Sequence, residues 1–225
     1  MLAEDLLQLM LDDRSGAPST DATTLDYGLA GAVLVELSLA ERIEIGEAGR
    51  WHRATVTVLD PSPTGDDVLD HALAEIAAKP VNAQRLVTRL AKGLRRQLLD
   101  RLVQHQVLRE EHGRLLGVFP TRRWPSTDPR SEQALRRRLR DVLVGGARPD
   151  PGTAALICVL SSMDQAHKVL ADLDKPARQQ VKRRAAELAD GDWASHAVRA
   201  AIRASQDATT AAIVAASVAA TTAST

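Results

Sequence analysis

Residues 28–39 read Gly-Leu-Ala-Gly-Ala-Val-Leu-Val-Glu-Leu-Ser-Leu, and this stretch decides the fold class. Apolar residues recur at four-residue steps, at Leu29, Val33 and Leu37, and most positions between them are also apolar. That spacing is typical of an α-helix, and a helix that is apolar on nearly every side is one that other elements surround. We therefore expect a central helix, in which Glu36 needs a partner or an exposed edge.

Helical patterns also occur on both sides of this stretch along the chain. Leucines and Met10 recur at helical spacing within residues 2–11, and turn-forming residues at 14–18 end that pattern. The later segments with helical periodicity are residues 68–76, 86–103 with a break at Gly93, 131–143, 151–162, 163–190 and 193 onward. We therefore expect a bundle of helices around residues 28–39.

Two short segments carry strand patterns instead. Residues 42–45 alternate with period two, residues 46–49 supply turn chemistry, and the β-branched residues 54–59 return, which predicts a β-hairpin. Residues 107–119 predict a second hairpin, with its turn near Gly113. Both hairpins are small additions to a helical chain.

The chain shows no sign of division into domains. Its 225 residues are enough to bury a hydrophobic core, and no stretch is rich enough in Gly, Pro or Ser to act as a linker. We predict a mainly α fold, in which residues 1–225 form a single globular helical domain around a central helix bundle, with small β-hairpins.

Composition argues against several classes of partner and location. Acidic and basic residues balance at 29 each, and three Trp, one Tyr and one Phe leave little to stack on bases, so we expect no nucleic-acid partner. The first residues carry acids where a signal peptide carries basic residues, and no stretch reaches the roughly 20 apolar residues of a spanning helix. We expect a cytoplasmic protein that is at most peripheral at the inner membrane face.

Sequence signatures of catalysis and metal binding are absent. The six histidines are scattered, and neither a Gly-x-Ser-x-Gly elbow nor a glycine-rich phosphate loop occurs. Asp66, Asp67 and Asp70 crowd one helical turn, where helix capping and the helix dipole explain them. Cys158 lies in an apolar run, as a buried thiol does. We therefore predict a protein that is not an enzyme and needs no metal or cofactor.

Basic residues supply the first candidate site. Arg95 and Arg96 lie three and four residues after Lys92, which places the three on one helical face where they can converge on a phosphate. Arg89 lies on the same side. The alternative interpretation is a solvated helix face, which is also how we interpret the arginines of residues 136–140.

A second candidate lies in residues 120–125, which predict an irregular basic loop. Arg122, Arg123 and Trp124 combine two positive charges with an indole ring, and this combination suits the interface between membrane and water. In the alternative interpretation, Trp124 packs against the body of the protein.

Four segments, taken in order, resemble the Golgi phosphoprotein 3 family, in a bacterial-type member. The most specific is Pro-Thr-Gly-Asp-Asp-Val-Leu-Asp-His-Ala-Leu at residues 63–73, which is similar to the family's Pro-Thr-Gly-Asp turn and the helix start that follows it. The other three are residues 6–13, 28–39 and 98–108. With the alanine-rich C-terminal segment, the likeness covers nearly the whole chain.

The resemblance implies a function as well as a fold. It implies a non-enzymatic, peripheral adaptor with a basic pocket for phosphatidylinositol 4-phosphate or another anionic lipid headgroup at a membrane surface, and with protein cargo as a further partner. The family's hairpin is associated with self-association, which implies a homo-oligomer here. The apolar hairpin residues that would mediate it are Leu115, Leu116, Val118 and Phe119.

The resemblance also implies where the headgroup binds. The family pocket combines a tryptophan and an arginine, before and within the second helix, with two arginines three residues apart on a later helix. The later pair falls on Lys92 and Arg95. The earlier arginine falls on Ala30 and the tryptophan falls near Asp21, so half of the family pocket is missing from this sequence.

Two alternatives belong to other functional classes. A basic helix followed by a hairpin is also the order of a winged-helix nucleic-acid-binding module, or of a protein-interaction module. An enzyme whose site is assembled only in space is the third hypothesis. The neutral charge and the resemblance along the chain favour the lipid-binding adaptor.

Overall fold

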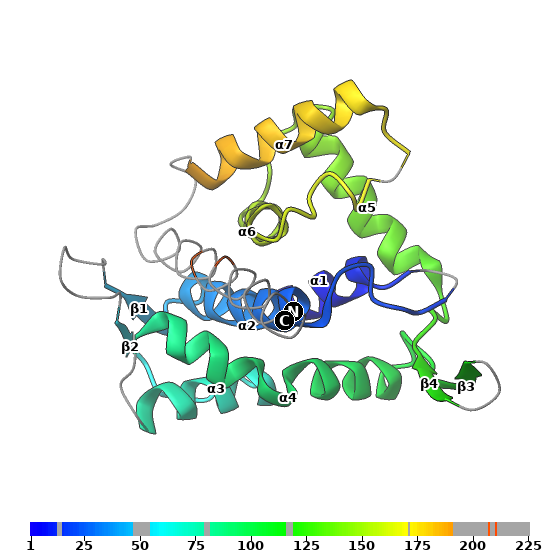
Figure 1. Cartoon of the computed structure of the whole chain (residues 1–225). Helices are drawn as coiled ribbons and strands as arrows, with labels where there is room; N and C mark the ends of the chain where they lie inside the picture. The colour runs from blue at the N-terminus through cyan, green and yellow to red at the C-terminus, as the bar shows by residue number, and fades with distance from the viewer. Residues whose placement is uncertain are drawn as a thin grey trace, which may run out of the picture.

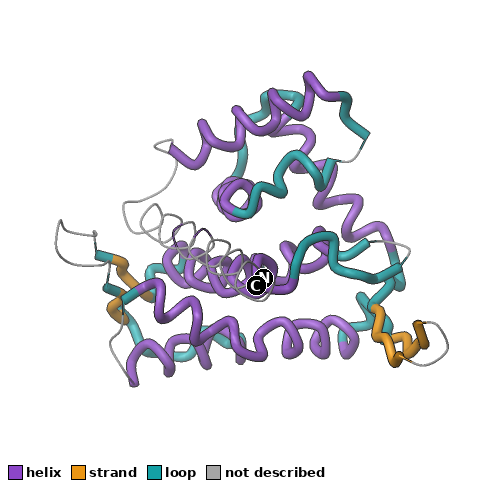
Figure 2. The backbone as a smooth tube through the Cα atoms, in the orientation of Figure 1, coloured by secondary structure: helices purple, strands orange, loops and turns teal. Residues whose placement is uncertain are grey.

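Seven α-helices and two antiparallel hairpins make up the part of the chain that the computed structural model describes (Figures 1 and 2). The described residues are 1–12, 15–46, 55–78, 82–115, 119–170, 172–190, 207 and 210. In chain order the elements are α1 (Leu2–Met10), α2 (Ala22–Leu39), β1 (Ile43–Ile45), β2 (Val56–Val58), α3 (Asp67–Ala78), α4 (Ala83–Gln104), β3 (Glu111–Leu115), β4 (Phe119–Arg123), α5 (Pro129–Leu143), α6 (Pro151–Ser162) and α7 (Lys175–Asp190). The mainly helical fold class with small hairpins is confirmed.

Helix α2 is the central element that its sequence predicts. It packs against α1, α3, α4 and α6, and Leu29, Val33 and Leu37 are almost completely buried. Figure 1 shows α1 and α2 in a middle layer, with α3 and α4 on one side and α5, α6 and α7 on the other. Glu36 has the partner that we expected, because it accepts a hydrogen bond of 2.8 Å from the backbone N–H of Leu2.

The first hairpin forms as predicted, but the second differs from its prediction. In the first, Ile43 pairs with Val58. In the second, Gly113 pairs with Thr121 inside the ladder, so the predicted turn near Gly113 is wrong, and residues 120–123 belong to β4 rather than to an irregular loop. Both strands of a two-stranded sheet are edge strands, which tolerate a proline such as Pro120.

A long helix predicted over residues 163–190 is also wrong. Only Lys175–Asp190 is helical, and Asp164, with φ 54°, has left the right-handed helical region at the start of the preceding segment. The carboxylate of Asp174 accepts a hydrogen bond of 2.9 Å from the backbone N–H of Ala177, which starts the helix anew with Pro176 in its first turn.

Several predictions fall on residues that the structure does not describe. These are the helix from residue 193 onward, most of the first hairpin's turn, and Leu116 and Val118 of the second hairpin. The prediction of one domain over residues 1–225 therefore stays a prediction. Within the described ranges, no helix combines the length and apolar character needed to cross a bilayer.

Candidate functional site

A kink in α4 positions the first candidate site. The backbone of Lys92 has φ −68° and ψ 108°, and Gly93 has φ 80°, so the helix breaks where the sequence predicts a break. A positive φ favours glycine, and no atom lies within 4 Å of the place that a Cβ on Gly93 would take. Residues 92 and 93 therefore interrupt the regular helical spacing on which the convergence of the three basic side chains was predicted.

Lys92 lies at a small cavity between α2, α3 and α4. The cavity measures about 60 Å³, and its other polar lining residues are His71, Glu75, Arg89 and Gln97. Arg89 is engaged there, with its Nε 2.9 Å from a Glu75 carboxylate oxygen. Lys92 is exposed and has no ion-pair partner among the residues that the structure describes. Its ammonium group is therefore available to an anion.

Arg95 turns toward the central helix. Its Nε lies 3.1 Å from the Oδ1 atom of Asp26 on α2, and the two side chains are 30% and 29% exposed. The Asp26 carboxylate thus occupies the position of an anion beside one of the predicted phosphate-binding residues. Nothing in the local sequence around Arg95 indicates this pairing.

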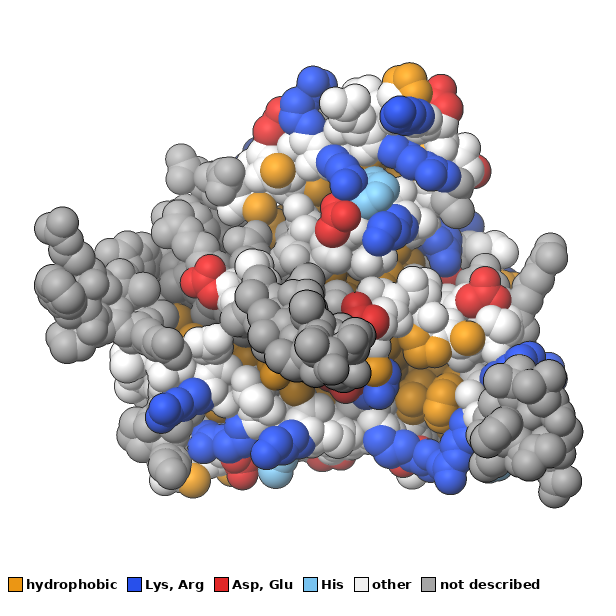
Figure 3. Space-filling model, in the orientation of Figure 1, with side chains coloured by type: hydrophobic (Ala, Val, Ile, Leu, Met, Phe, Trp, Pro, Cys, Tyr) orange, Lys and Arg blue, Asp and Glu red, His pale blue; other side chains and the backbone are white. Residues whose placement is uncertain are grey.

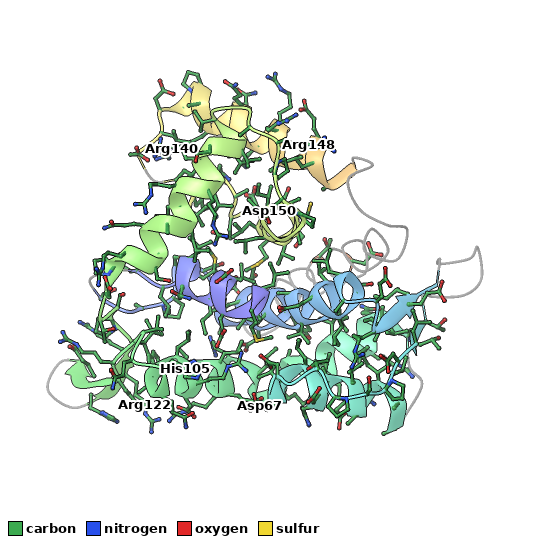
Figure 4. All side chains as sticks on the ribbon, turned by 180° about the vertical axis from the view of Figure 1, so that it is seen from behind. Asp67, His105, Arg122, Arg140, Arg148 and Asp150 are labelled. Carbon is green, nitrogen blue, oxygen red and sulfur yellow. The ribbon has the colours of Figure 1, made fainter. Side chains whose placement is uncertain are left out.

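Arg96 joins the two candidate sites that the sequence treats as separate. Its Nε lies 2.9 Å from Asp100, and its Nη1 lies 3.6 Å from the Oε1 atom of Glu110. The same Glu110 oxygen is 3.3 Å from Nη1 of Arg122 on β4. Figure 4 shows Arg122 on the hairpin beyond the C-terminal end of α4. Arg96 on α4 and Arg122 on the hairpin therefore share the Glu110 carboxylate.

Trp124 packs against the body of the protein, while the two arginines before it are exposed. The Trp124 ring is partly buried against the core, and its indole Nε1 is buried. Its backbone N–H donates a 3.2 Å hydrogen bond to the carbonyl oxygen of Gly16, which has φ 61°. A Cβ on Gly16 would lie 2.3 Å from the Trp124 backbone, so only glycine allows this approach. Membrane contact through Arg122 and Arg123 stays a prediction.

The self-association surface is only partly described. The backbones of Leu115 and Phe119 are paired as the last residues of the hairpin ladder. Leu116 and Val118 lie between them, outside the described residues. Self-association through these four residues is therefore also still a prediction.

An ion-pair network around Arg101 was missed by the sequence analysis. Its Nε lies 2.7 Å from Glu4 on α1, and its Nη1 lies 3.0 Å from Asp66 and 2.9 Å from Asp67. Figure 4 shows Asp67 beside α4. Two of the segments that resemble the family, the Pro-Thr-Gly-Asp turn and residues 98–108, contribute to this network. Their resemblance to the family is the one feature of the sequence that could have indicated the network.

The acid cluster at the start of α3 is structural, as its capping interpretation predicted. Asp66 accepts hydrogen bonds of 2.9 and 3.2 Å from the backbone N–H groups of Val68 and Leu69. Burial opposes ionisation of Asp66, but the hydrogen bonds from Arg101 and from these N–H groups lower its pKa below the ordinary value. Asp70 accepts hydrogen bonds from the backbone and hydroxyl of Thr64. Among the described residues, no group of His, Cys, Asp or Glu is arranged to hold a metal ion.

A second, larger cavity is unsuited to an anionic ligand. It measures about 220 Å³ and lies between α1, α2, α5 and α6, with Asp5, Glu36, Asp150 and Arg138 as its charged side chains. Burial raises the pKa values of Asp5 and Glu36. The cations of this cavity are Arg138 and the Met1 ammonium group, which three carboxyl groups face, so the lining has no excess of positive charge and the kink of α4 is the better candidate anion site.

Known proteins resemble this chain along most of its length. The family model described as Golgi phosphoprotein 3 (GPP34) matches residues 2–205. Vacuolar protein sorting-associated protein 74 of Eremothecium gossypii is 27% identical over 220 residues, and the match covers 83% of this chain and 66% of that protein, just under two thirds of its length. The bacterial-type assignment stays a prediction. The chain belongs to the Golgi phosphoprotein 3 family.

Proposed function

We propose that this protein is a non-enzymatic adaptor that binds anionic lipid headgroups at a membrane surface through Lys92 and Arg95, with Arg96 beside them. The observation that carries the proposal is the kink of α4, which presents an exposed lysine without an ion-pair partner in the described structure, next to a cavity. The resemblance of the sequence to the family supports this proposal, because it implies that the later half of the headgroup pocket falls on Lys92 and Arg95. The proposed location is cytoplasmic, at the inner face of a membrane.

The chemistry of the two residues suits a phosphate. Lysine contributes a compact point charge, whereas the planar guanidinium of Arg95 can bind two phosphate oxygens at once. Figure 3 shows Lys and Arg side chains spread over separate parts of one face, with acidic side chains among them. With 29 acidic and 29 basic residues in the chain, a local group of cations must attract the lipid, because the net charge does not.

The proposed site differs from the family pocket in selectivity. Ala30 stands where the resemblance places an arginine, and it is fully buried in α2. Asp21, near the place of the family tryptophan, accepts a hydrogen bond from the N–H of Thr24 as the N-cap of α2. Neither residue can contribute a positive charge or an indole ring. We therefore propose weak discrimination between phosphatidylinositol 4-phosphate and other acidic lipids.

The adaptor proposal includes a protein partner. The relative's name associates that protein with vacuolar protein sorting, which supports a role in protein sorting for this chain as well. The family match over residues 2–205 favours this function over a winged-helix nucleic-acid-binding module. It also favours an adaptor over an enzyme.

Flotation on liposomes tests the proposal. A Lys92→Gln, Arg95→Gln, Arg96→Gln variant should bind acidic liposomes roughly two orders of magnitude more weakly than the wild type at low salt, and added salt should reduce the difference. A matched control replaces three exposed basic residues elsewhere, in Arg137→Gln, Lys168→Gln, Lys175→Gln, and changes the net charge equally. Equal binding by the wild type and the site variant would refute the proposal.

Self-association through the second hairpin is the other part of the proposed function. The apolar residues Leu115, Leu116, Val118 and Phe119 support it, because an edge hairpin with apolar side chains tends to pair with another copy. Sedimentation of a Leu116→Glu, Phe119→Glu variant tests it. The variant should sediment as a smaller species than the wild type, and an unchanged mass would contradict a role for the hairpin.

A further inference from the structure

Asp26 lies at the proposed lipid site, beside Arg95, and the proposed function does not involve it. It lies on α2, five residues beyond the N-cap Asp21, and α2 packs along α4. Its Oδ1 atom is buried and makes no hydrogen bond of good geometry within the described structure, although it lies 3.1 Å from Arg95. The contact is therefore an ion pair between two packed helices rather than part of a hydrogen-bonded network.

Stability does not explain why a carboxylate is placed there. Burial raises the pKa of Asp26, and the attraction of Arg95 only partly offsets this, while Asp21 adds repulsion. The fold therefore holds the negative charge of Asp26 at a net disadvantage. Ion pairs that are this exposed contribute little to stability in general. A residue that is unfavourable for folding and lies against a proposed ligand-binding arginine is a candidate for tuning the binding.

Charge at the site gives Asp26 a specific effect. Asp100 and Glu110 balance the charge of Arg96, so the groups that decide the net charge beside an incoming phosphate are Lys92, Arg95 and Asp26. The net charge of these three groups is one positive charge. Without Asp26 it would be two. A site with one net positive charge matches a phosphodiester headgroup with one negative charge better than a phosphomonoester with nearly two.

We infer that Asp26 is a specificity-determining residue of the lipid site: it competes with the ligand for Arg95 and favours singly charged phosphodiester headgroups over phosphomonoesters. The inference rests on the proposed function. A bound phosphate must either displace the Asp26 carboxylate from Arg95 or lie next to it, and the repulsion grows with the charge on the phosphate.

Asp26→Asn tests the inference, because asparagine keeps the shape and removes the charge. Flotation compares vesicles containing phosphatidylglycerol with vesicles containing phosphatidylinositol 4-phosphate, at matched surface charge and low salt. Asp26→Asn should strengthen binding to the phosphoinositide vesicles by about fivefold, which corresponds to about 1 kcal/mol at 1.4 kcal/mol per tenfold change. Binding to phosphatidylglycerol vesicles should rise by a smaller factor.

Two controls separate this effect from a general gain in positive charge. Asp172→Asn removes the carboxylate of another Asp–Arg pair, with Arg140, and changes the net charge equally, so it should change neither binding constant. In an Arg95→Gln background, Asp26→Asn should give a smaller gain, because the competition for Arg95 is gone and only the repulsion between Asp26 and the phosphate is relieved. Circular dichroism and thermal unfolding check that each variant is folded.

The outcomes distinguish failure of the inference from failure of the proposed function. If Asp26→Asn binds like the wild type, or keeps its full gain in the Arg95→Gln background, while the Lys92, Arg95 and Arg96 triple variant loses binding, the lipid site stands and the role of Asp26 is refuted. If neither the wild type nor Asp26→Asn binds any vesicle better than the triple variant does, both are refuted.

Discussion

Arg101 and Arg95 lie on the same half of α4, after its kink, but their guanidinium groups differ in burial and in pairing. Arg101 is 14% exposed and lies within 3.0 Å of carboxylate oxygens of Glu4, Asp66 and Asp67. Arg95 is 30% exposed and has one carboxylate partner, Asp26, within the described ranges. The difference in burial and in the number of partners separates a structural arginine from one that is available to a ligand.

The comparison shows how the surroundings decide the role of a cation. Burial opposes the charge of Arg101, but hydrogen bonds from its guanidinium to Asp66 and Glu4 raise its pKa further above the ordinary value. Through these partners Arg101 ties α1 and the turn before α3 to α4. Arg95 connects α2 and α4, which already pack against each other through apolar residues. Loss of Arg101 should therefore loosen the fold, and loss of Arg95 should not.

The largest effect should come from Arg101→Gln. The substitution leaves Glu4 and Asp66 partly buried without their cation, and it should lower the free energy of unfolding by about 2–3 kcal/mol. Arg95→Gln is the matched control and should cost less than about 1 kcal/mol. Urea denaturation measures both. Equal losses in the two variants would contradict the division between a structural and an available arginine.

A smaller effect should follow from Gly93→Ala at the kink that lies before both arginines. A residue with a Cβ at φ 80° costs about 1–2 kcal/mol relative to the right-handed region, although nothing crowds the Cβ here. Gly146→Ala is a matched control, since Gly146 also has a positive φ and open space. Both variants should lose similar stability, but only Gly93→Ala should also weaken liposome binding. Weakening by both would mean that the kink has no particular role.

The most subtle difference is in the pH dependence of the two carboxylates that pair with these arginines. The pKa of Asp26 is raised, which means that the folded state favours the protonated carboxyl group. The stability that this group contributes is therefore lost as the pH rises through its folded-state pKa. The pKa of Asp66 is lowered, so its contribution is present above the ordinary value of 3.8 and is lost as the pH falls through its folded-state pKa.

Denaturation of the wild type and two variants from neutral to acidic pH measures this difference. Asp26→Asn should be more stable than the wild type at neutral pH, and the gap should close as the pH falls. Asp66→Asn should be less stable at neutral pH, with a gap that closes only below pH 3.8. Parallel curves for the two variants would show that the two ion pairs do not differ in this way.

Local patterns in the sequence predicted the scaffold well. The buried helix at residues 28–39, the first hairpin and the break at Gly93 depend on the spacing of apolar residues and on the backbone freedom of glycine, which act between near neighbours in the chain. The errors are also local: the turn placed at Gly113 and the helix extended over residues 163–174 followed weak turn and helix signals. In both places the nearby residues allow more than one backbone conformation.

The sequence by itself thus determined the helical class, the central helix and the basic residues near residue 93. Only the tertiary structure decided which of those basic residues has no ion-pair partner within the described ranges. Glu4 and Arg101 are 97 positions apart, and Asp26 and Arg95 lie on different helices. Such partners are chosen by how α1, α2 and α4 pack, and the packing depends on burial of apolar surface along the whole length of each helix, which no local pattern of charges encodes.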